Sequence, residues 1–322
     1  MIDILEQFAM QYPLLFHILI IIASLVLLIL AADKALDGIV NYARKLGLSG
    51  YLIGLIVISI GASMPELVSS LMGSFEGDAG VIFGTILGSN ISGIALVVGA
   101  SALFAKKLDL DPHVLERTEV MTFFMVLLPF ILILDGVLGR IDAAVMILVY
   151  LVYIYMVWRK EGQMGGIKKD VKLERIYLDG IIFALALAVI LLSGRYLVYS
   201  SIRVSSILEI PSYLVSLVII GLGTSMPDLT VSIRSLMKGE KGIGIGNSLG
   251  SIVVKSLLFL GILALLNPII VDPWTIAFAE FALLLSIGLI FYFTSKKMLT
   301  WKHGLILIGV YLVFILKEVF LR

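Results

Sequence analysis

Long apolar runs recur from one end of the chain to the other, and they limit what it can fold into more than any other feature. Each run is close to the length of helix that crosses ~30 Å of hydrocarbon. The 322 residues are 60% hydrophobic and only 15% charged, whereas a soluble domain carries about 25% charged residues. Because no soluble core needs so many long apolar segments, the sequence predicts an all-α membrane protein.

Polar breaks between the runs predict ten transmembrane helices. The expected spans are 14–33, 48–73, 80–104, 119–135, 139–158, 176–200, 210–236, 242–266, 274–294 and 302–320. The longest break is a charged, glycine-containing linker over 159–175, which divides the chain into a first half, 1–158, and a second half, 176–322. The start of the chain is acidic where a signal peptide would be basic, so the first run is expected to be retained as a span.

The distribution of basic residues predicts the orientation in the membrane. Most of the 24 Lys and Arg residues lie in the odd-numbered loops, which include the linker. By the positive-inside rule these loops are cytoplasmic and both termini lie outside. The sequence therefore predicts an integral protein of the plasma membrane, surrounded by the lipid bilayer. The net charge of +1 gives no global attraction to nucleic acid.

An internal repeat is the second strong signal. Residues 57–99 align with residues 219–261 at a fixed offset of 162 and without a gap. The strongest match is a Gly-X-Ser-Met-Pro-acid motif, present at 61–66 and again at 223–228. An odd number of spans separates the two copies, so they run in opposite directions and predict two inverted five-helix repeats. Inverted repeats with discontinuous helices at the membrane midplane are typical of secondary transporters.

Each motif combines a helix-breaking residue with a carboxylate. Pro65 and Pro227 each remove one backbone hydrogen bond from an apolar helix. Freed carbonyls are tolerated at membrane depth only where they line a cavity or bind something. Glu66 and Asp228 each cost about 3 kcal/mol at the centre of a membrane helix on insertion scales, and such residues by default mark a functional site.

The residue types around the two carboxylates predict the class of ligand. The hydroxyl oxygens expected beside them belong to Ser63, Thr224, Ser225, Ser89 and Ser251. Hydroxyl, carbonyl and carboxylate oxygens suit Na⁺ and Ca²⁺ rather than soft transition metals. The chain has no cysteine, which excludes disulfides and thiolate metal sites. Inorganic cations are therefore the expected partners, as transported ions, and no cofactor is expected.

The two motifs carry a resemblance to a known family. The chain resembles the sodium/calcium exchangers of the calcium/cation antiporter superfamily, in their compact prokaryotic form. The family pattern is Gly-Thr-Ser-X-Pro-Glu followed by Gly-Ser-Asn. Here it is matched by 61–66 with Gly88-Ser89-Asn90, and by 223–228 with Gly250-Ser251.

The resemblance implies a site and a transport mechanism. It implies four cation positions between the second, third, seventh and eighth spans, with Glu66 and Asp228 as the central carboxylates. It adds the backbone carbonyls of Ser59 and Gly221 to the five hydroxyl residues as ligands. It also implies that spans one and six slide across this core to alternate access.

Departures from the family pattern leave the transported ion open. Ala62 replaces a threonine of the first motif, and Asp228 is one methylene shorter than the family glutamate. Gly93, four residues past Ser89, replaces an Asn or Asp, and Lys255, four residues past Ser251, replaces an acid. Helical i, i+4 spacing places residue 255 on the same face as Ser251, so Lys255 is expected to point into the cavity.

The sequence supports more than one function. The first hypothesis is exchange of Ca²⁺ and/or Na⁺ with altered stoichiometry, and the second is a cation/proton antiporter in which Lys255 is a tethered or titrating charge. A membrane enzyme is disfavoured because the only histidines, His17, His113 and His303, lie far from the motifs. A receptor-like protein that has lost transport is a minor alternative, motivated by the altered ligands.

Overall fold

The structure is a computed structural model of the chain. It describes residues 10–45, 59–105, 107–109, 118–161, 176–226, 228–229, 232–233, 248–295 and 298–320. Its α-helices are α2 (Pro13–Lys45), α4 (Ser59–Ala62), α5 (Met64–Phe75), α6 (Ala79–Ile91), α7 (Gly99–Ala105), α9 (Thr118–Leu132), α10 (Arg140–Glu161), α11 (Ile176–Leu208), α12 (Ser212–Val215), α13 (Gly221–Thr224), α16 (Leu260–Leu266), α17 (Pro273–Ser295) and α18 (Trp301–Phe320). Three π-helical segments interrupt these helices, namely η2 (Ser92–Val98), η3 (Ser216–Ile220) and η4 (Val254–Phe259).

Within the described residues, seven helices are long and apolar enough to cross a membrane. They cover Pro13–Lys34, Ala79–Phe104, Arg140–Val157, Ala184–Leu208, Ser248–Leu266, Pro273–Phe293 and Trp301–Phe320, and shorter apolar helices cover Met121–Leu132 and Ser212–Thr224. These helices overlap every predicted span except 48–73, much of which lies outside the described residues. The all-α class is thereby confirmed, while the count of ten spans stays a prediction. Most of the predicted linker, 159–175, also lies outside the described residues.

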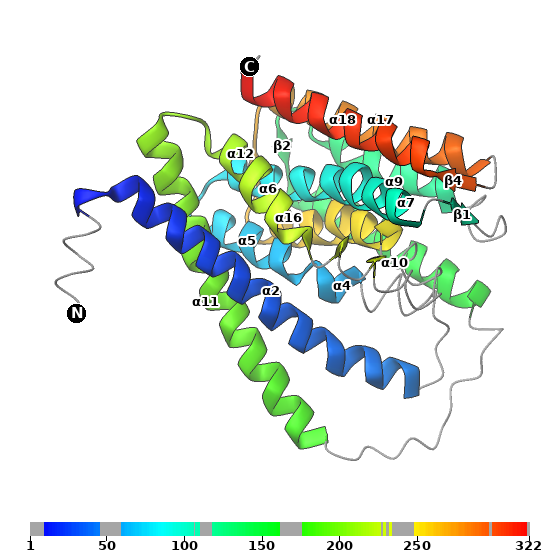
Figure 1. The fold of residues 1–322 in the computed structure, drawn as a ribbon, viewed down its shortest axis with the longest axis horizontal. Helices are drawn as coiled ribbons and strands as arrows, with labels where there is room; N and C mark the ends of the chain where they lie inside the picture. The colour runs from blue at the N-terminus through cyan, green and yellow to red at the C-terminus, as the bar shows by residue number, and fades with distance from the viewer. Residues whose placement is uncertain are drawn as a thin grey trace.

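The two longest helices exceed their predicted spans. Helices α2 and α11 each have 33 residues, where the apolar runs predicted 14–33 and 176–200. At 1.5 Å per residue each is about 50 Å long, more than the ~30 Å of a hydrocarbon core. Apolar runs mark only the part that lipid requires, and a helix continues beyond it because its backbone hydrogen bonds suit polar sequence equally well. The two helices pack along each other at one side of the molecule (Figure 1).

Four short strands were not predicted. Strand β1 (Lys107–Asp109) pairs antiparallel with β4 (Met298–Thr300), and β2 (Val137–Leu138) pairs antiparallel with β3 (Ile269–Ile270). Each pair therefore joins a segment of the first half to a segment of the second. The strands lie in breaks between apolar helices, where backbone groups without helical partners still need hydrogen bonds.

The same local features recur 162 residues apart. Helix α4 ends at Ala62 and α13 at Thr224, and segment η2 begins at Ser92 and η4 at Val254. The strands follow the same offset, because β1 begins at Lys107 and β3 at Ile269. The duplicated sequence thus produces duplicated local structure. The opposite orientation of the two halves in a membrane stays a prediction.

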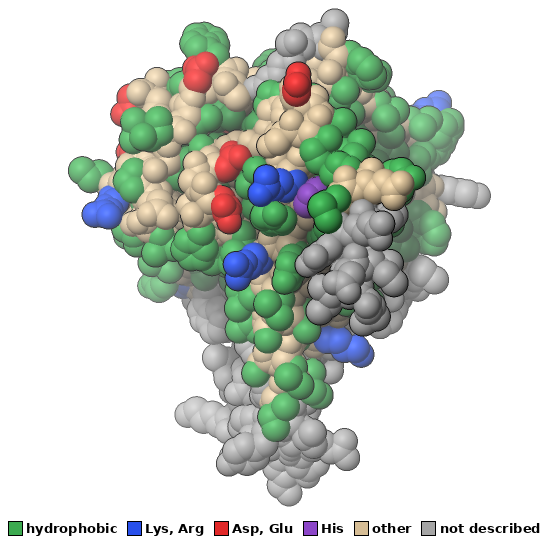
Figure 2. All heavy atoms as spheres, turned by 90° about the vertical axis from the view of Figure 1, so that its left-hand side faces the viewer, with side chains coloured by type: hydrophobic (Ala, Val, Ile, Leu, Met, Phe, Trp, Pro, Cys, Tyr) green, Lys and Arg blue, Asp and Glu red, His purple; other side chains and the backbone are tan. Residues whose placement is uncertain are grey.

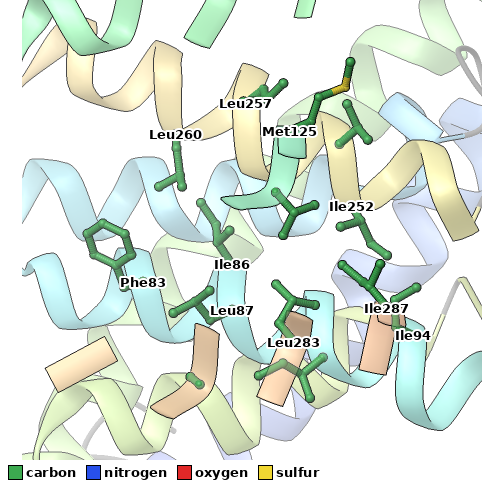
Figure 3. Close-up of a cluster of buried hydrophobic side chains, with 14 of the residues drawn as sticks. Phe83, Ile86, Leu87, Ile94, Met125, Ile252, Leu257, Leu260, Leu283 and Ile287 are labelled. Atoms are coloured by element: carbon green, nitrogen blue, oxygen red, sulfur yellow. The ribbon is translucent and has the colours of Figure 1, made fainter. Parts of the chain in front are cut away.

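Helix α6 lies at the centre of the molecule. Eleven of its 13 residues are buried, whereas large apolar side chains on α2, α10 and α11 are exposed, as expected for helices that face lipid. Figure 2 shows hydrophobic side chains spread over much of one face, with a few charged side chains among them. Figure 3 shows Phe83, Ile86 and Leu87 of α6 in a buried cluster with Leu260 of α16 and Leu283 of α17.

Glycines let α6 touch the second half backbone to backbone. A Cβ atom added at Gly88 would lie 2.3 Å from the carbonyl oxygen of Leu217, in η3. A Cβ atom added at Gly221 would lie 2.7 Å from the Cα atom of Gly88. Such distances exclude any larger residue without a shift of backbone, and small residues at membrane-helix contacts permit this approach. This contact places the helix that follows the first motif directly against the helix that leads into the second motif.

Candidate cation site

Both copies of the motif break a helix at their serine. Helix α4 ends at Ala62 and α5 begins at Met64, and Ser63 between them has φ −91° and ψ 7°. Pro65, in the first turn of α5, has no N–H to donate to the carbonyl of Gly61. In the second copy, Ser225 follows α13 with φ −80° and ψ −6°. The breaks free polar backbone next to the acids; Pro227 itself lies outside the described residues.

Three charged side chains meet beside these breaks, and we call them the charge triad: Glu66 of α5, Asp228 of the second motif and Lys255 of η4. The Nζ atom of Lys255 lies 3.5 Å from Oε1 of Glu66 and 3.7 Å from Oδ2 of Asp228. Glu66 and Lys255 are 0% exposed and Asp228 is 2% exposed. The structure thus places one ammonium within ion-pair distance of the carboxylate of each repeat.

Because the triad is buried, its stability depends on how well its positive and negative charges balance. Taking isolated charges out of water costs several kcal/mol each, and mutual attraction offsets this only when the charges remain paired. With both carboxylates ionised and the lysine protonated, the triad carries a net charge of minus one. Removing the lysine would leave two like charges close together in the protein interior. The triad therefore needs a cation, either the lysine itself or one from solution.

A cluster of hydroxyls and carbonyls lies where α6 and η2 meet α13. The Ser225 hydroxyl donates to the carbonyl of Gly221 at 2.7 Å and lies 3.3 Å from the carbonyl of Ser89. It also contacts the Ser92 hydroxyl, which lies 3.3 Å from the carbonyl of Gly221. Two of the expected carbonyl and hydroxyl positions are thus brought together, and hydrogen bonds hold them there.

The other predicted hydroxyls are arranged differently. Three of them donate to carbonyls of their own helix: Ser89 to Ile86 at 3.2 Å, Ser251 to Ser248 at 3.3 Å and Thr224 to Ile220 at 2.9 Å. A donating hydroxyl still keeps lone pairs that can bind a cation. The Ser63 hydroxyl is buried without a hydrogen-bond partner among the described residues, and Ser59 is fully buried on α4.

Sequence reasoning gave no role to several polar residues that lie nearby. Ser92 belongs to the hydroxyl cluster, and the side-chain amide of Asn90 donates to the Ser256 hydroxyl at 2.9 Å. The sequence could have indicated these residues, because each is a polar residue inside an apolar run. At Gly93, an added Cβ atom would meet nothing within 4 Å. That open space occupies the position in the first repeat that Lys255 occupies in the second.

Comparison with known proteins decides the family. A family model described as sodium/calcium exchanger protein matches residues 16–159 and 179–319, which is most of the chain. The chain belongs to the sodium/calcium exchanger family. This membership confirms the resemblance that the motifs indicated, and it makes the chain an integral membrane protein of a family of cation antiporters.

Individual antiporters and exchangers resemble the chain over most of its length. The sodium/calcium exchanger MaX1 of Methanosarcina acetivorans is 26% identical over 353 residues, covering 93% of this chain and 97% of its own. CaxA of Alkalimonas amylolytica is 30% identical over 264 residues, covering 78% of this chain and 81% of its own. The structure of the sodium-calcium exchanger NCX_Mj, at 20% identity, matches with a TM-score of 0.70 and covers 96% of this chain and 100% of its own, which shows the shared fold.

Proposed function

We propose that the protein is a secondary cation antiporter with altered stoichiometry, in which the Lys255 ammonium occupies a cation position between Glu66 and Asp228. The charge triad carries this proposal, because its single ammonium is buried within 4 Å of both carboxylates. Membership of the exchanger family supplies the class of activity. Carboxylate, hydroxyl and carbonyl oxygens around the helix breaks are the ligands that Na⁺ and Ca²⁺ prefer.

The charge of the triad limits what it can carry. A net charge of minus one balances one monovalent cation and matches Ca²⁺ poorly. Within the described residues, no group of three acidic or histidine side chains is placed to hold a metal ion. An acid at position 255 would supply a third carboxylate. We therefore expect fewer positive charges to move in each cycle than in a relative that carries an acid there.

The packing of α2 and α11 supports transport by alternating access. These two helices pack mainly against each other and meet the rest of the protein through narrower contacts. One contact is between Gly194 of α11 and Val68 of α5, where an added Cβ atom would lie 2.4 Å from Cγ1 of the valine. In the proposed mechanism this pair, which contains spans one and six, slides across α5 and α13 and exposes the triad to one side at a time.

A cation/proton antiporter is the second candidate, because the Lys255 ammonium lies within 4 Å of both carboxylates that would bind the cation. A cation that binds between Glu66 and Asp228 must compete with the ammonium. If Lys255 loses a proton when the cation enters, cation transport becomes coupled to proton transport in the opposite direction. The two candidates differ in which gradient drives uptake. A third possibility, a receptor-like protein without transport, predicts no flux under either gradient.

Flux measurements on purified protein in liposomes separate these candidates. Uptake of radioactive Ca²⁺ and of Na⁺ is followed under an opposing Na⁺ gradient and, separately, under a pH gradient. We expect uptake driven by a Na⁺ gradient if the first candidate is right and uptake driven by a pH gradient if the second is right. Absence of gradient-driven flux for every cation would contradict antiport altogether.

Variants at position 255 test the role of the lysine. Lys255→Asp adds a carboxylate and is expected to raise Ca²⁺ uptake relative to the wild type, while Lys255→Ala is expected to alter ion preference and the pH profile. Lys317→Ala is the matched control, because Lys317 lies on α18 and pairs with Glu318 rather than with the triad. If ion preference and pH profile both stay unchanged in the two Lys255 variants, the lysine has no part in transport.

A further inference from the structure

A second buried carboxyl group lies apart from the triad. Glu280, on α17, is only 5% exposed. Its Oε1 atom has no hydrogen-bond partner among the described residues, and none of them forms an ion pair with it. An acid in the middle of an apolar helix by default marks a functional site. The transport mechanism proposed for the triad does not use Glu280.

Glu280 lines a small cavity with a largely apolar wall. The lining residues come from α6, α9, η4, α16 and α17, and Ser256 provides the only other polar side chain among them. Phe83, Ile86, Leu87 and Leu260 all line the cavity, and Figure 3 shows these four side chains in one buried cluster. The cavity volume is about 10 Å³, which is room for about one water molecule.

The lining of the cavity decides which ligand it can take. An ionised carboxylate in an apolar environment is too costly to persist alone, so it must bind a proton or a cation. A calcium ion takes six to eight oxygen ligands, but the side chains here offer only the two oxygens of Glu280 and the one of Ser256. A hydrated cation also exceeds the available space. A proton is the ligand that fits.

Charged groups on the neighbouring helices are engaged elsewhere. Helix α17 packs against α6, η2, α9, α18 and β4, and α6, η2 and β4 carry no ionisable side chain. Glu119 on α9 lies outside the described side chains. The remaining ionisable groups are Lys255 on η4, paired with Glu66 and Asp228, and five on α18. Lys302 lies over the Trp301 ring, His303 stacks on Phe293, Tyr311 contacts the Phe314 ring, and Lys317 pairs with Glu318 and lies over the Phe278 ring.

A hydrogen bond connects the cavity to the helices of the cation site. Ser256, which lines the cavity, accepts a hydrogen bond of 2.9 Å from the amide of Asn90. Ser256 follows Lys255 of the triad, and Asn90 follows Ser89 of the hydroxyl cluster. A protonated carboxyl group can donate a hydrogen bond, and a carboxylate can only accept one. Glu280 and Ser256 line the same cavity, but no hydrogen bond joins them among the described residues. A change of protonation at Glu280 would therefore reach the Ser256 hydroxyl through a water molecule, for which the cavity has room.

We propose that Glu280 is a proton-binding site separate from the charge triad, and that Ser256 and Asn90 couple it to the helices that carry the cation site. The site gives the protein a means to sense or carry a proton whichever cation it exchanges. It goes beyond the proposed function, because it does not depend on the role of Lys255.

Infrared difference spectra recorded over a pH titration of the purified protein test the proton site directly. We expect the wild type to show the carbonyl band of a buried carboxylic acid, and Glu280→Gln, which keeps the shape of the side chain, to lose it. Glu318→Gln is the control, because it removes another buried acid on the adjacent helix α18, and it is expected to keep the band. An unchanged spectrum in Glu280→Gln would overturn the proposal.

A second measurement on the wild type guards against misfolding of the variant. An apolar carbodiimide reacts with protonated carboxyl groups, and mass spectrometry locates the modified residue. We expect labelling of Glu280 that declines as the pH rises; absence of label at Glu280 throughout would contradict the proposal. Neither measurement requires transport, so failure here is distinct from failure of the flux experiments.

The coupling has its own test. Ser256→Ala removes the hydroxyl that joins the cavity to Asn90. It is expected to shift the pH midpoint of the Glu280 band by about one unit, since loss of one hydrogen bond relayed through water in the cavity is worth about one unit of protonation equilibrium. Ser286→Ala, on the same helix as Glu280 but bonded to the Ala282 carbonyl, is the control and is expected to leave the midpoint in place. An unshifted midpoint in Ser256→Ala would refute the coupling.

Discussion

The two copies of the repeated motif have similar local backbone structure but different side chains around it. In both, a helix ends at the residue before the motif serine, and a π-helical segment follows at the same distance along the chain. The side chains differ. The first copy has open space at Gly93 and an unpartnered hydroxyl at Ser63, while the second has a buried lysine at 255 and a bonded hydroxyl at Ser225.

The difference shows that two copies of a repeated sequence can keep the same local backbone while their charged residues differ. Pro65 removes a backbone hydrogen bond at the break of the first copy, and Gly88 and Gly221 allow the close helix contact between the two copies. Side chains at the same positions are free to change, provided that the buried charges stay balanced. One ammonium from the second copy balances carboxylates from both. The asymmetry at a single aligned pair, Gly93 and Lys255, therefore sets the charge of the whole site.

The largest expected effect comes from removing the charge that only the second copy has. Lys255→Met keeps the length of the side chain but leaves Glu66 and Asp228 without their cation. In buffer free of Na⁺ and Ca²⁺ we expect a loss of about 3–5 kcal/mol in the free energy of unfolding, measured by tryptophan fluorescence.

Added cations should reduce the loss of stability in Lys255→Met. If a cation replaces the ammonium between the two carboxylates, Na⁺ or Ca²⁺ should restore much of the stability of Lys255→Met and affect the wild type less. Lys317→Met, which alters a partly exposed lysine, should lose less stability and show no such dependence. A Lys255→Met protein as stable as the wild type in cation-free buffer would show that the lysine does not balance the two carboxylates.

A smaller effect is expected from filling the space around α6 in the first copy. Gly88→Ala forces a Cβ atom against the Leu217 carbonyl, and overpacking of this kind costs about 1–3 kcal/mol. Gly93→Ala is the matched variant five residues later, where the same methyl group meets nothing within 4 Å. It should be neutral or stabilise by up to about 1 kcal/mol. Thermal unfolding of both variants checks this, and equal destabilisation would mean that the space at Gly93 is not open.

The smallest expected effect separates the two motif serines. Ser225→Ala loses a hydrogen bond to the Gly221 carbonyl, which is worth about 1 kcal/mol. Ser63→Ala should cost less, because the hydroxyl of Ser63 has no partner among the described residues. Urea or thermal unfolding of the two variants provides the measurement. A larger loss in Ser63→Ala would show that the first copy holds its serine more firmly than the second.

The sequence singled out residues that the structure brings close together, but it did not predict the limits of the helices. The motif serines, both acids and Lys255 could be singled out because polar residues are conspicuous in apolar runs and a repeat aligns them. The ends of α2 and α11 were missed because hydrophobicity marks the lipid-facing part of a helix and not its hydrogen-bonded length. The strands were missed because their partners are far apart in sequence, and short pairs have no strong pattern of their own.

By itself, the sequence determined the membrane class, the exchanger family and the residue types of the site, because apolar run length, proline and glycine act locally on the backbone. Only the tertiary structure decided which charges meet. Glu66, Asp228 and Lys255 come from three separate segments, and their balance depends on distances of less than 4 Å between side-chain atoms. The same holds for Glu280. Five elements line the cavity beside it, and Ser256 is the only other polar side chain that they contribute.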